Sequence, residues 1–153
     1  MRALELKFPP PAVALVTALI MWLVSRAAPA FRFGVPAGSA LAATLAVVGV
    51  VIAISGVVTF RRARTTVNPT KPQSSSSLVT WGVYTISRNP MYLGLLLVLT
   101  GWAIFLSNAL AFLFLPAYIF YMNRFQIAPG ERALASLFGQ EFAAYQSRVR
   151  RWL

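Results

Sequence analysis

The residues best suited to chemistry form one stretch, Arg88-Asn89-Pro90-Met91-Tyr92-Leu93-Gly94, where a basic, polar segment meets a very apolar one. Arg88 is a permanent cation, and Pro90 suits the first position of a helix because proline lacks an amide hydrogen. Gly94 allows another backbone to approach closely. The same residue types also occur at the edges of ordinary membrane helices, where arginine and tyrosine favour the interface. Taken alone, the stretch indicates either a reactive site at a membrane surface or a plain helix start.

Composition limits the chemistry of such a site. The chain contains no cysteine, no histidine and no aspartate, and its three carboxylate side chains are Glu5, Glu131 and Glu141. These absences exclude thiol catalysis, a histidine-based triad, a zinc site and haem ligation through histidine or cysteine. We therefore expect no metal. An enzyme built from this chain needs a pre-activated cofactor, arginine electrostatics, or tyrosine with a single glutamate.

The overall composition is that of an integral membrane protein. Of the 153 residues, 58% are hydrophobic and 11% are charged, and the mean hydropathy is +0.69. Fourteen Lys and Arg residues against three acidic ones give a net charge of +11, and the basic residues cluster at the ends of apolar runs. This distribution fits the anionic lipids of a membrane leaflet better than nucleic acid, so we expect lipid partners and no nucleic acid.

Two uncharged runs in the first part of the chain predict membrane helices at about 11–25 and 37–60. The second run easily covers the roughly 20 residues that a bilayer requires. A cleavable signal peptide is the alternative for the first run. However, Arg26 follows the apolar core where small residues would mark a cleavage site, which favours a retained helix.

A third uncharged run, residues 89–123, is too long for one crossing. As a single helix it would extend about 50 Å, against a hydrocarbon core of about 30 Å. Ser107-Asn108 is the polar pair near its middle, so the sequence predicts a hairpin with helices at 90–106 and 109–122.

The basic residues predict the orientation of this bundle. Four crossings place both termini and the loop 61–89 on one side, together with every lysine and arginine except Arg26 and Arg32. The excess of positive charge marks the cytoplasmic side, so both termini are expected in the cytoplasm.

The segment 129–153 predicts a cytoplasmic or interfacial amphipathic helix. Pro129 suits its first turn, and Glu131 follows where the helix dipole favours a carboxylate. Apolar residues recur at three- to four-residue spacing: Leu134, Phe138, Phe142, Tyr145, Val149 and Trp152. Taken alone, with the arginines at its end, the segment is typical of an anchor on anionic lipid. The predicted fold is one all-α integral membrane domain, 1–153, with about four transmembrane helices, the hairpin and this helix.

Four pieces of the chain, in this order, resemble the isoprenylcysteine carboxyl methyltransferase and phospholipid methyltransferase superfamily in its small bacterial form. They are Phe60-Arg61-Arg62-Ala63-Arg64-Thr65-Thr66, Leu78-Val79-Thr80-Trp81-Gly82-Val83-Tyr84, the stretch from Arg88 to Gly94, and Phe138-Gly139 with Tyr145 and Arg148-Val149-Arg150-Arg151-Trp152. The chain departs from the family pattern at two positions. Asn89 stands where the family usually has histidine, and Gly130 stands where it has the first of two glutamates.

The resemblance implies an enzyme of the bacterial inner membrane that takes S-adenosylmethionine from the cytoplasm. The methyl group would pass to a carboxylate or amine of a lipophilic substrate that enters from the bilayer. Transfer from a sulfonium needs positioning, desolvation and electrostatic support more than a metal or a histidine.

The resemblance also implies site residues. The candidate catalytic residues are Arg88, Glu131 and Arg124. The implied cofactor-binding residues are Leu78, Val79, Tyr84, Arg88, Asn89, Pro90, Met91, Tyr92 and Glu131. Arg88 would support a carboxylate of the cofactor or substrate, and Glu131 would hold the cofactor's amino group. Both groups belong to the methionyl end of the cofactor, so we expect Arg88 and Glu131 to lie close together.

Three other classes of protein are alternatives. A small transporter is disfavoured, because such pumps need an ionisable group inside the membrane and no glutamate lies in a predicted span. A non-catalytic lipid-binding or scaffold protein is compatible with all of the sequence features except the number of family-like pieces that occur together. A sterol-reductase-like enzyme of a related fold remains open, although the chain has no Gly-x-Gly-x-x-Gly fingerprint.

Overall fold

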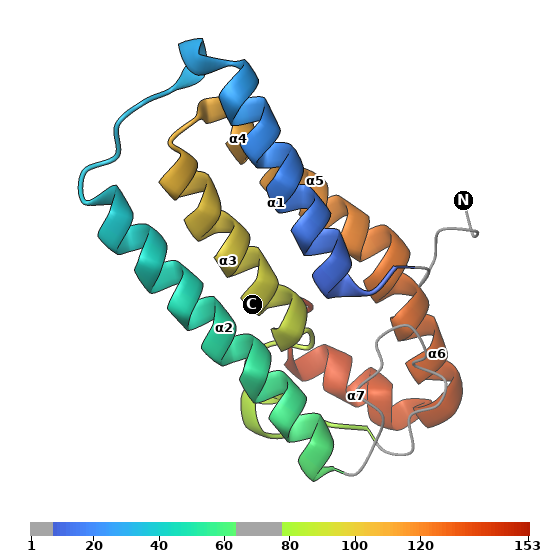
Figure 1. The fold of residues 1–153 in the computed structure, drawn as a ribbon. Helices are drawn as coiled ribbons and strands as arrows, with labels where there is room; N and C mark the ends of the chain where they lie inside the picture. The colour runs from blue at the N-terminus through green and yellow to red at the C-terminus, as the bar shows by residue number, and fades with distance from the viewer. Residues whose placement is uncertain (1–7, 64–77) are drawn as a thin grey trace.

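The computed structural model describes residues 8–63 and 78–153, which form helices joined by short turns, with no β-strand within these ranges (Figure 1). Residues 64–66 of the first family-like piece, and residues 64–77 of the predicted loop 61–89, lie outside the described residues.

The first two helices are slightly longer than the sequence predicted. Helix α1 is Pro10–Ala27 and helix α2 is Gly38–Arg62, against predictions of 11–25 and 37–60. Proline at the start of α1 suits its first turn, where no intrahelical donor is needed. Among the described residues, α1 and α2 are long and apolar enough to cross a membrane, with mean hydropathies of 1.5 and 2.6.

Helix α3, Pro90–Leu106, has the predicted bounds, and the predicted break at Ser107-Asn108 is present. Ser107 ends the helix in the left-handed region, with φ of 53°. The Asn108 side chain caps the next helix by accepting from the Leu110 amide at 3.0 Å. Its Nδ2 also donates to the Ala28 carbonyl at 2.8 Å, which ties this turn to the end of α1.

The predicted helix 109–122 continues further than expected. Its first part is α4, Ala109–Phe112, followed by α5, Phe114–Met122. A π turn, Asn123–Ile127, then carries the chain directly into α6, Ala128–Phe138. Proline at 129 removes one helical amide donor, and a π turn is one way in which a helix accommodates such a local defect.

The single helix predicted for 129–153 is wrong. The segment forms the end of α6, then α7, Gln140–Arg148, then an extended segment from Val149 onward. The break falls at Gly139, whose backbone (φ 51°, ψ −115°) is accessible almost only to glycine. The two helices therefore meet at an angle (Figure 1).

The apolar face of α6 and α7 packs against protein, whereas a lipid anchor would expose this face to the membrane. Phe142, Tyr145 and Val149 are buried in a cluster with Val79 and Tyr84, from the segment before α3. Leu134 and Phe138 pack against the same cluster. This face is therefore occupied by protein over most of its length.

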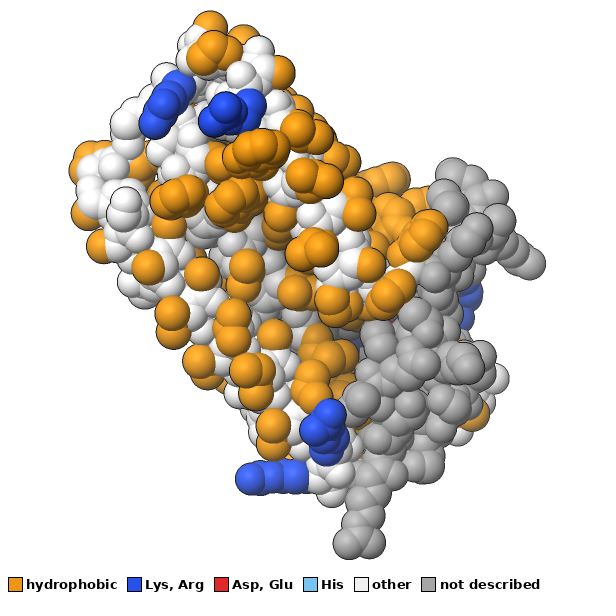
Figure 2. Space-filling model, viewed as in Figure 1, with side chains coloured by type: hydrophobic (Ala, Val, Ile, Leu, Met, Phe, Trp, Pro, Cys, Tyr) orange, Lys and Arg blue, Asp and Glu red, His pale blue; other side chains and the backbone are white. Residues whose placement is uncertain are grey.

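Helices α1, α2, α3 and α4–α5 run alternately up and down, with α3 between α2 and the other two (Figure 1). Helices α6 and α7 lie at the lower end, near the end of α2 and the start of α3. The outer faces of α1 and α2 are apolar yet exposed, as Figure 2 shows; Leu15 is 75% and Val47 62% exposed. Exposure on this scale is unlike the core helix of a soluble protein and suits a lipid environment.

Small residues bring α2 and α3 into backbone contact. They recur every seven residues on both helices, at Ala42, Gly49 and Gly56 of α2 and at Gly94 and Gly101 of α3. A Cβ at Gly101 would lie 2.6 Å from the Ala42 carbonyl oxygen, and one at Gly94 would overlap the Gly49 carbonyl oxygen. Close approach through small residues is the usual packing of membrane helices. The close approach expected at Gly94 is confirmed.

Replacement of Gly94 by alanine should therefore destabilise the fold. The added Cβ also falls 2.8 Å from the Cβ of Ala53, so backbone must move, and overpacking of this kind costs about 1–3 kcal/mol. Thermal unfolding of the purified protein in detergent measures the effect. The matched control is Gly130→Ala, at a helical glycine whose Cβ would meet nothing within 4 Å. Equal melting temperatures for the two variants would contradict the close packing.

Candidate functional site

Arg88 and Glu131, which are 43 positions apart, lie close together, as we expected from the resemblance, and the structure shows that they form an ion pair with each other. Arg88 lies just before α3, and Glu131 lies in the first turn of α6. Arg88 Nη1 donates to Glu131 Oε2 at 2.7 Å, and the two side chains are 13% and 16% exposed. Because both are largely removed from solvent, each charge needs the other.

Arg151, which was not among the predicted site residues, completes this cluster. Its Nε donates to Glu131 Oε2 at 3.2 Å, and its Nη2 donates to Glu131 Oε1. In the sequence, Arg151 belongs to the last of the four family-like pieces and to a basic patch typical of a lipid anchor, but neither pattern assigned it a role in the site. Two arginines and one glutamate leave the cluster with a formal charge of +1.

The cluster has unused hydrogen-bonding capacity of both kinds. Within the part of the chain that the structure describes, the buried Arg88 Nε has no hydrogen-bond partner, a rare situation for a buried donor. Glu131 Oε1 accepts one bond from Arg151, whereas Oε2 accepts two. A carboxylate oxygen has two lone pairs, so one acceptor position remains on Oε1. The cluster can therefore bind a ligand that has both an anionic and a cationic group.

Asn89 contributes to the site through the main chain of the last residues. The side-chain Nδ2 of Asn89 donates to the Arg151 carbonyl at 2.9 Å, and the backbone amide of Asn89 donates to Ser87 Oγ at 3.1 Å. Ser87 is fully buried. It was not predicted as a site residue, because no pattern in the sequence distinguishes it from other serines. The turn before α3 is thus fixed on both sides of Arg88.

The other predicted cofactor-binding residues belong to two apolar groups of the core. Val79 and Tyr84 are buried against α7, and Leu78 packs on the same group. Tyr92 is buried among α3, α5 and the π turn, and Met91 packs on that second group. Pro90 is fully buried at the start of α3. The first group comes from the segment before the Arg88-Asn89 turn and the second from the helix that begins directly after it, and their role in cofactor binding stays a prediction.

Arg124, the third predicted catalytic residue, lies in the π turn. Its guanidinium lies over the Phe125 ring, 5.4 Å from the ring centroid. Its catalytic role stays a prediction.

Two buried tyrosines beside the cluster remain protonated. Burial raises the pKa of Tyr84 and of Tyr145 above the ordinary value of 10.0, although the Arg88 and Arg148 charges oppose the rise for Tyr145. The Tyr145 hydroxyl donates to the Tyr84 carbonyl at 2.7 Å. These hydroxyls therefore act as hydrogen-bonding groups and not as bases at neutral pH.

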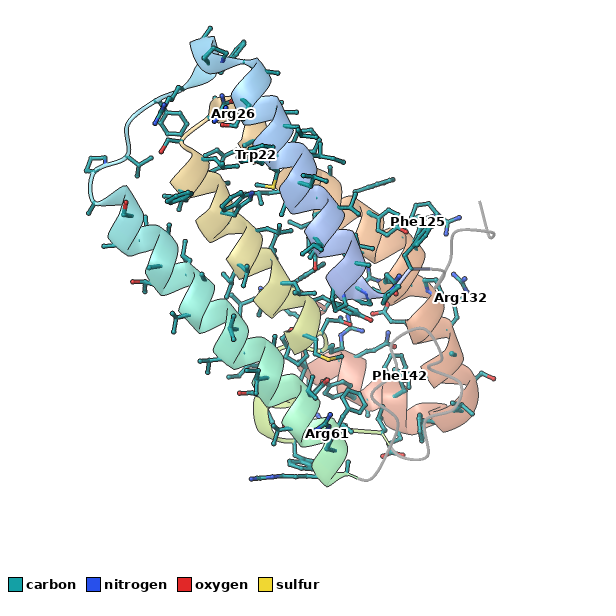
Figure 3. The ribbon with its side chains drawn as sticks, in the orientation of Figure 1. Trp22, Arg26, Arg61, Phe125, Arg132 and Phe142 are labelled. Carbon is teal, nitrogen blue, oxygen red and sulfur yellow. The ribbon has the colours of Figure 1, made fainter. Side chains whose placement is uncertain are left out.

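The position of the site in the bundle is visible in the side-chain view. Phe142 of α7 and Arg61 of α2 lie at the lower end of the molecule, whereas Arg26 lies near the opposite end of α1 (Figure 3). The ion cluster and the first of the apolar groups share the lower end with them, since they are built from the start of α3 and from α6 and α7.

Comparison with known proteins identifies the family. A family model described as phospholipid methyltransferase matches residues 37–141, and the chain belongs to this family. An uncharacterized protein of Haemophilus influenzae is 49% identical over 63 residues, which are 41% of this chain and 100% of that protein. Protein-S-isoprenylcysteine O-methyltransferase B of Arabidopsis thaliana is 26% identical over 106 residues, which are 69% of this chain. The match spans about half, 54%, of the length of the Arabidopsis protein.

The raised tyrosine pKa values predict loss of stability in alkali. Above about pH 10 the unfolded chain releases tyrosine protons that the folded chain retains, so the free energy of unfolding should fall as the pH rises. Tyr145→Phe should make this fall shallower. At neutral pH it should cost about 1–2 kcal/mol, because the Tyr84 carbonyl loses a buried donor. Circular dichroism at several pH values measures both effects, and an identical pH slope in the variant would contradict the prediction.

Proposed function

We propose that this protein is a membrane methyltransferase that uses S-adenosylmethionine and methylates a lipophilic acceptor. The single observation that carries the proposal is the cluster of Arg88, Glu131 and Arg151, with one unused donor and one unused acceptor. Membership of the family supplies the reaction class.

The residues of the cluster fit the methionyl end of the cofactor. Arg88 Nε would donate to its carboxylate, and the remaining position on Glu131 Oε1 would accept from its ammonium group. Asn89 and Pro90 would fix the turn that carries Arg88. Leu78, Val79, Tyr84, Met91 and Tyr92 would form the apolar walls that exclude water. When bound, the cofactor would supply an activated methyl group, so the protein needs to position and desolvate the reactants.

The charge of the site favours a carboxylate as the methyl acceptor. An acceptor amine in its ammonium form, which unlike the cofactor brings no carboxylate, would be repelled by the excess positive charge and would have to lose a proton before it could attack. Among the described residues, we assign no base to this step, since Glu131 accepts from two arginines and the neighbouring tyrosines stay protonated. A carboxylate is attracted by the same charge and attacks without losing a proton. In this proposal Arg124, the third candidate catalytic residue, adds to that attraction.

The proposed arrangement in the membrane is four crossings, made by α1, α2, α3 and α4–α5. Its support is the exposed apolar surface of α1 and α2 and the apolar sequence of α3. The site end also carries Arg61, Arg62 and the arginines of α6 and α7, which suits an anionic cytoplasmic leaflet. Both termini and the site would then face the cytoplasm, in a bacterial inner membrane.

Binding of the demethylated cofactor, S-adenosylhomocysteine, tests the cofactor assignment. Wild-type protein in detergent should bind it in a calorimetric titration. Arg88→Gln and Glu131→Gln should each weaken binding by about 1.5–3 kcal/mol, the range for a hydrogen bond to a charged group. Glu141→Gln, at an exposed first-turn glutamate of α7, is the matched control and should bind normally. No binding to the wild type at millimolar ligand would favour the non-catalytic scaffold.

The acceptor class is tested with a pair of probes that differ only in their headgroup. We expect labelled methyl transfer to a long-chain carboxylic acid and none, or far less, to the amine of equal chain length. With the acid, the rate should change little between about pH 6 and about pH 9, because a carboxylate is ionised throughout this range. Preferential transfer to the amine, with a rate that rises about tenfold per pH unit below its pKa of about 10, would contradict the assignment.

A further inference from the structure

The segment Val149–Trp152 contacts three separate parts of the site within four residues. The Arg88 amide donates to the Arg150 carbonyl at 3.0 Å, and the Asn89 side chain donates to the Arg151 carbonyl at 2.9 Å. Trp152 Nε1 donates to Asn123 Oδ1 of the π turn at 2.9 Å. The segment therefore fastens the turn before α3 to the helix that carries Glu131.

The Arg151 side chain adds a contact of a different kind. It binds Glu131 with two of its nitrogens, one on each carboxylate oxygen, whereas Arg88 uses Nη1 alone. A paired contact of this kind is the strongest arrangement that an arginine makes with a carboxylate. Because Arg151 neutralises Glu131, Arg88 is not required to turn its whole guanidinium toward that carboxylate. Among the described residues, Arg88 Nε is left without a partner, in a buried position.

From this geometry we infer that Arg151 is a positioning residue, which acts through Glu131 to keep Arg88 ready for the carboxylate of the cofactor. The inference rests on the proposed function. Arg151 is 35% exposed, against 13% for Arg88, and no contact of Arg151 with the cofactor is required. Without Arg151, the whole charge of Glu131 would have to be balanced by Arg88. The capacity of Arg88 to bind a second carboxylate would then fall.

The test compares two ligands that share the adenosine and thioether groups. S-adenosylhomocysteine carries the amino and carboxylate groups, whereas 5′-methylthioadenosine lacks both. Arg151→Gln should raise the dissociation constant of S-adenosylhomocysteine by about tenfold or more, the loss expected for one charge-assisted hydrogen bond. It should leave the dissociation constant of 5′-methylthioadenosine within about twofold. A purely structural role would weaken both ligands together.

Two further variants make the test decisive. Arg151→Lys keeps the charge but lacks the planar fork, so it should fold and still bind S-adenosylhomocysteine several times more weakly than the wild type. Arg148→Gln removes an exposed arginine three positions earlier and should change neither ligand. Melting temperatures establish that each variant is folded at the temperature of the titration.

The outcomes separate the two proposals. If the wild type binds S-adenosylhomocysteine and Arg151→Gln binds it equally well, the role of Arg151 is overturned and the proposed function stands. Equal weakening of both ligands would also overturn it. If the wild type binds neither ligand, the proposed function fails, and this role of Arg151 fails with it.

Discussion

A single carboxylate, Glu131, joins three parts of the chain that are far apart in sequence. It accepts from Arg88, just before α3, and from Arg151, in the segment after α7, while itself lying at the start of α6. A charge that is largely removed from water needs opposite charges and hydrogen bonds, or its desolvation would exceed any gain from burial. The position of the turn before α3, and of the segment that contacts it, depends on this carboxylate.

The ion cluster is aligned by apolar packing elsewhere in the bundle. The small residues of α2 and α3 fix the axial position of α3, and the last of these contacts joins Gly56 to Pro90 and Met91. Pro90 directly follows the Arg88-Asn89 turn, so the depth at which Arg88 lies is set by backbone contact between two helices. Tyr84 and Tyr145 provide a second constraint, because their hydrogen bond ties the segment before α3 to α7. The packing of α2 against α3 and the hydrogen bond between Tyr145 and Tyr84 thus leave Arg88 little freedom of position.

Local signals predicted the parts of the fold that local chemistry determines. Proline at a first helical position and the polar Ser107-Asn108 pair gave the bounds of α3 correctly. The polar residues after Met122 indicated a helix end, but a π turn carries the helix past them. The spacing of apolar residues in 129–153 indicated one helix, but a single glycine conformation divides it. Both errors concern backbone geometry that periodicity does not encode.

The residues of the candidate site were likewise predicted only in part. Arg88 and Glu131 were predicted to meet because the family resemblance assigned them to the two ends of one ligand. Arg151 and Ser87 were missed because their partners, 20 and 64 positions away, are set by tertiary packing. A basic residue near other arginines has the same local pattern whether it contacts lipid or a carboxylate. Only the fold distinguishes the two.

Because glycine and not glutamate stands at position 130, the net charge of this site differs from the one that the family resemblance implies. By the resemblance described above, this position corresponds to the first of two glutamates, and a Cβ at Gly130 would meet nothing within 4 Å, so packing does not require glycine here. With two adjacent glutamates, the positive charges of the two arginines would be fully neutralised. With Gly130, Arg88 and Arg151 share one carboxylate and the cluster keeps an excess positive charge. In a partly desolvated site such an excess is only weakly screened, so it attracts anionic groups and repels cationic ones more strongly than it would in water. This excess charge is the physical basis of the proposal that the site prefers ligands that bring a carboxylate of their own.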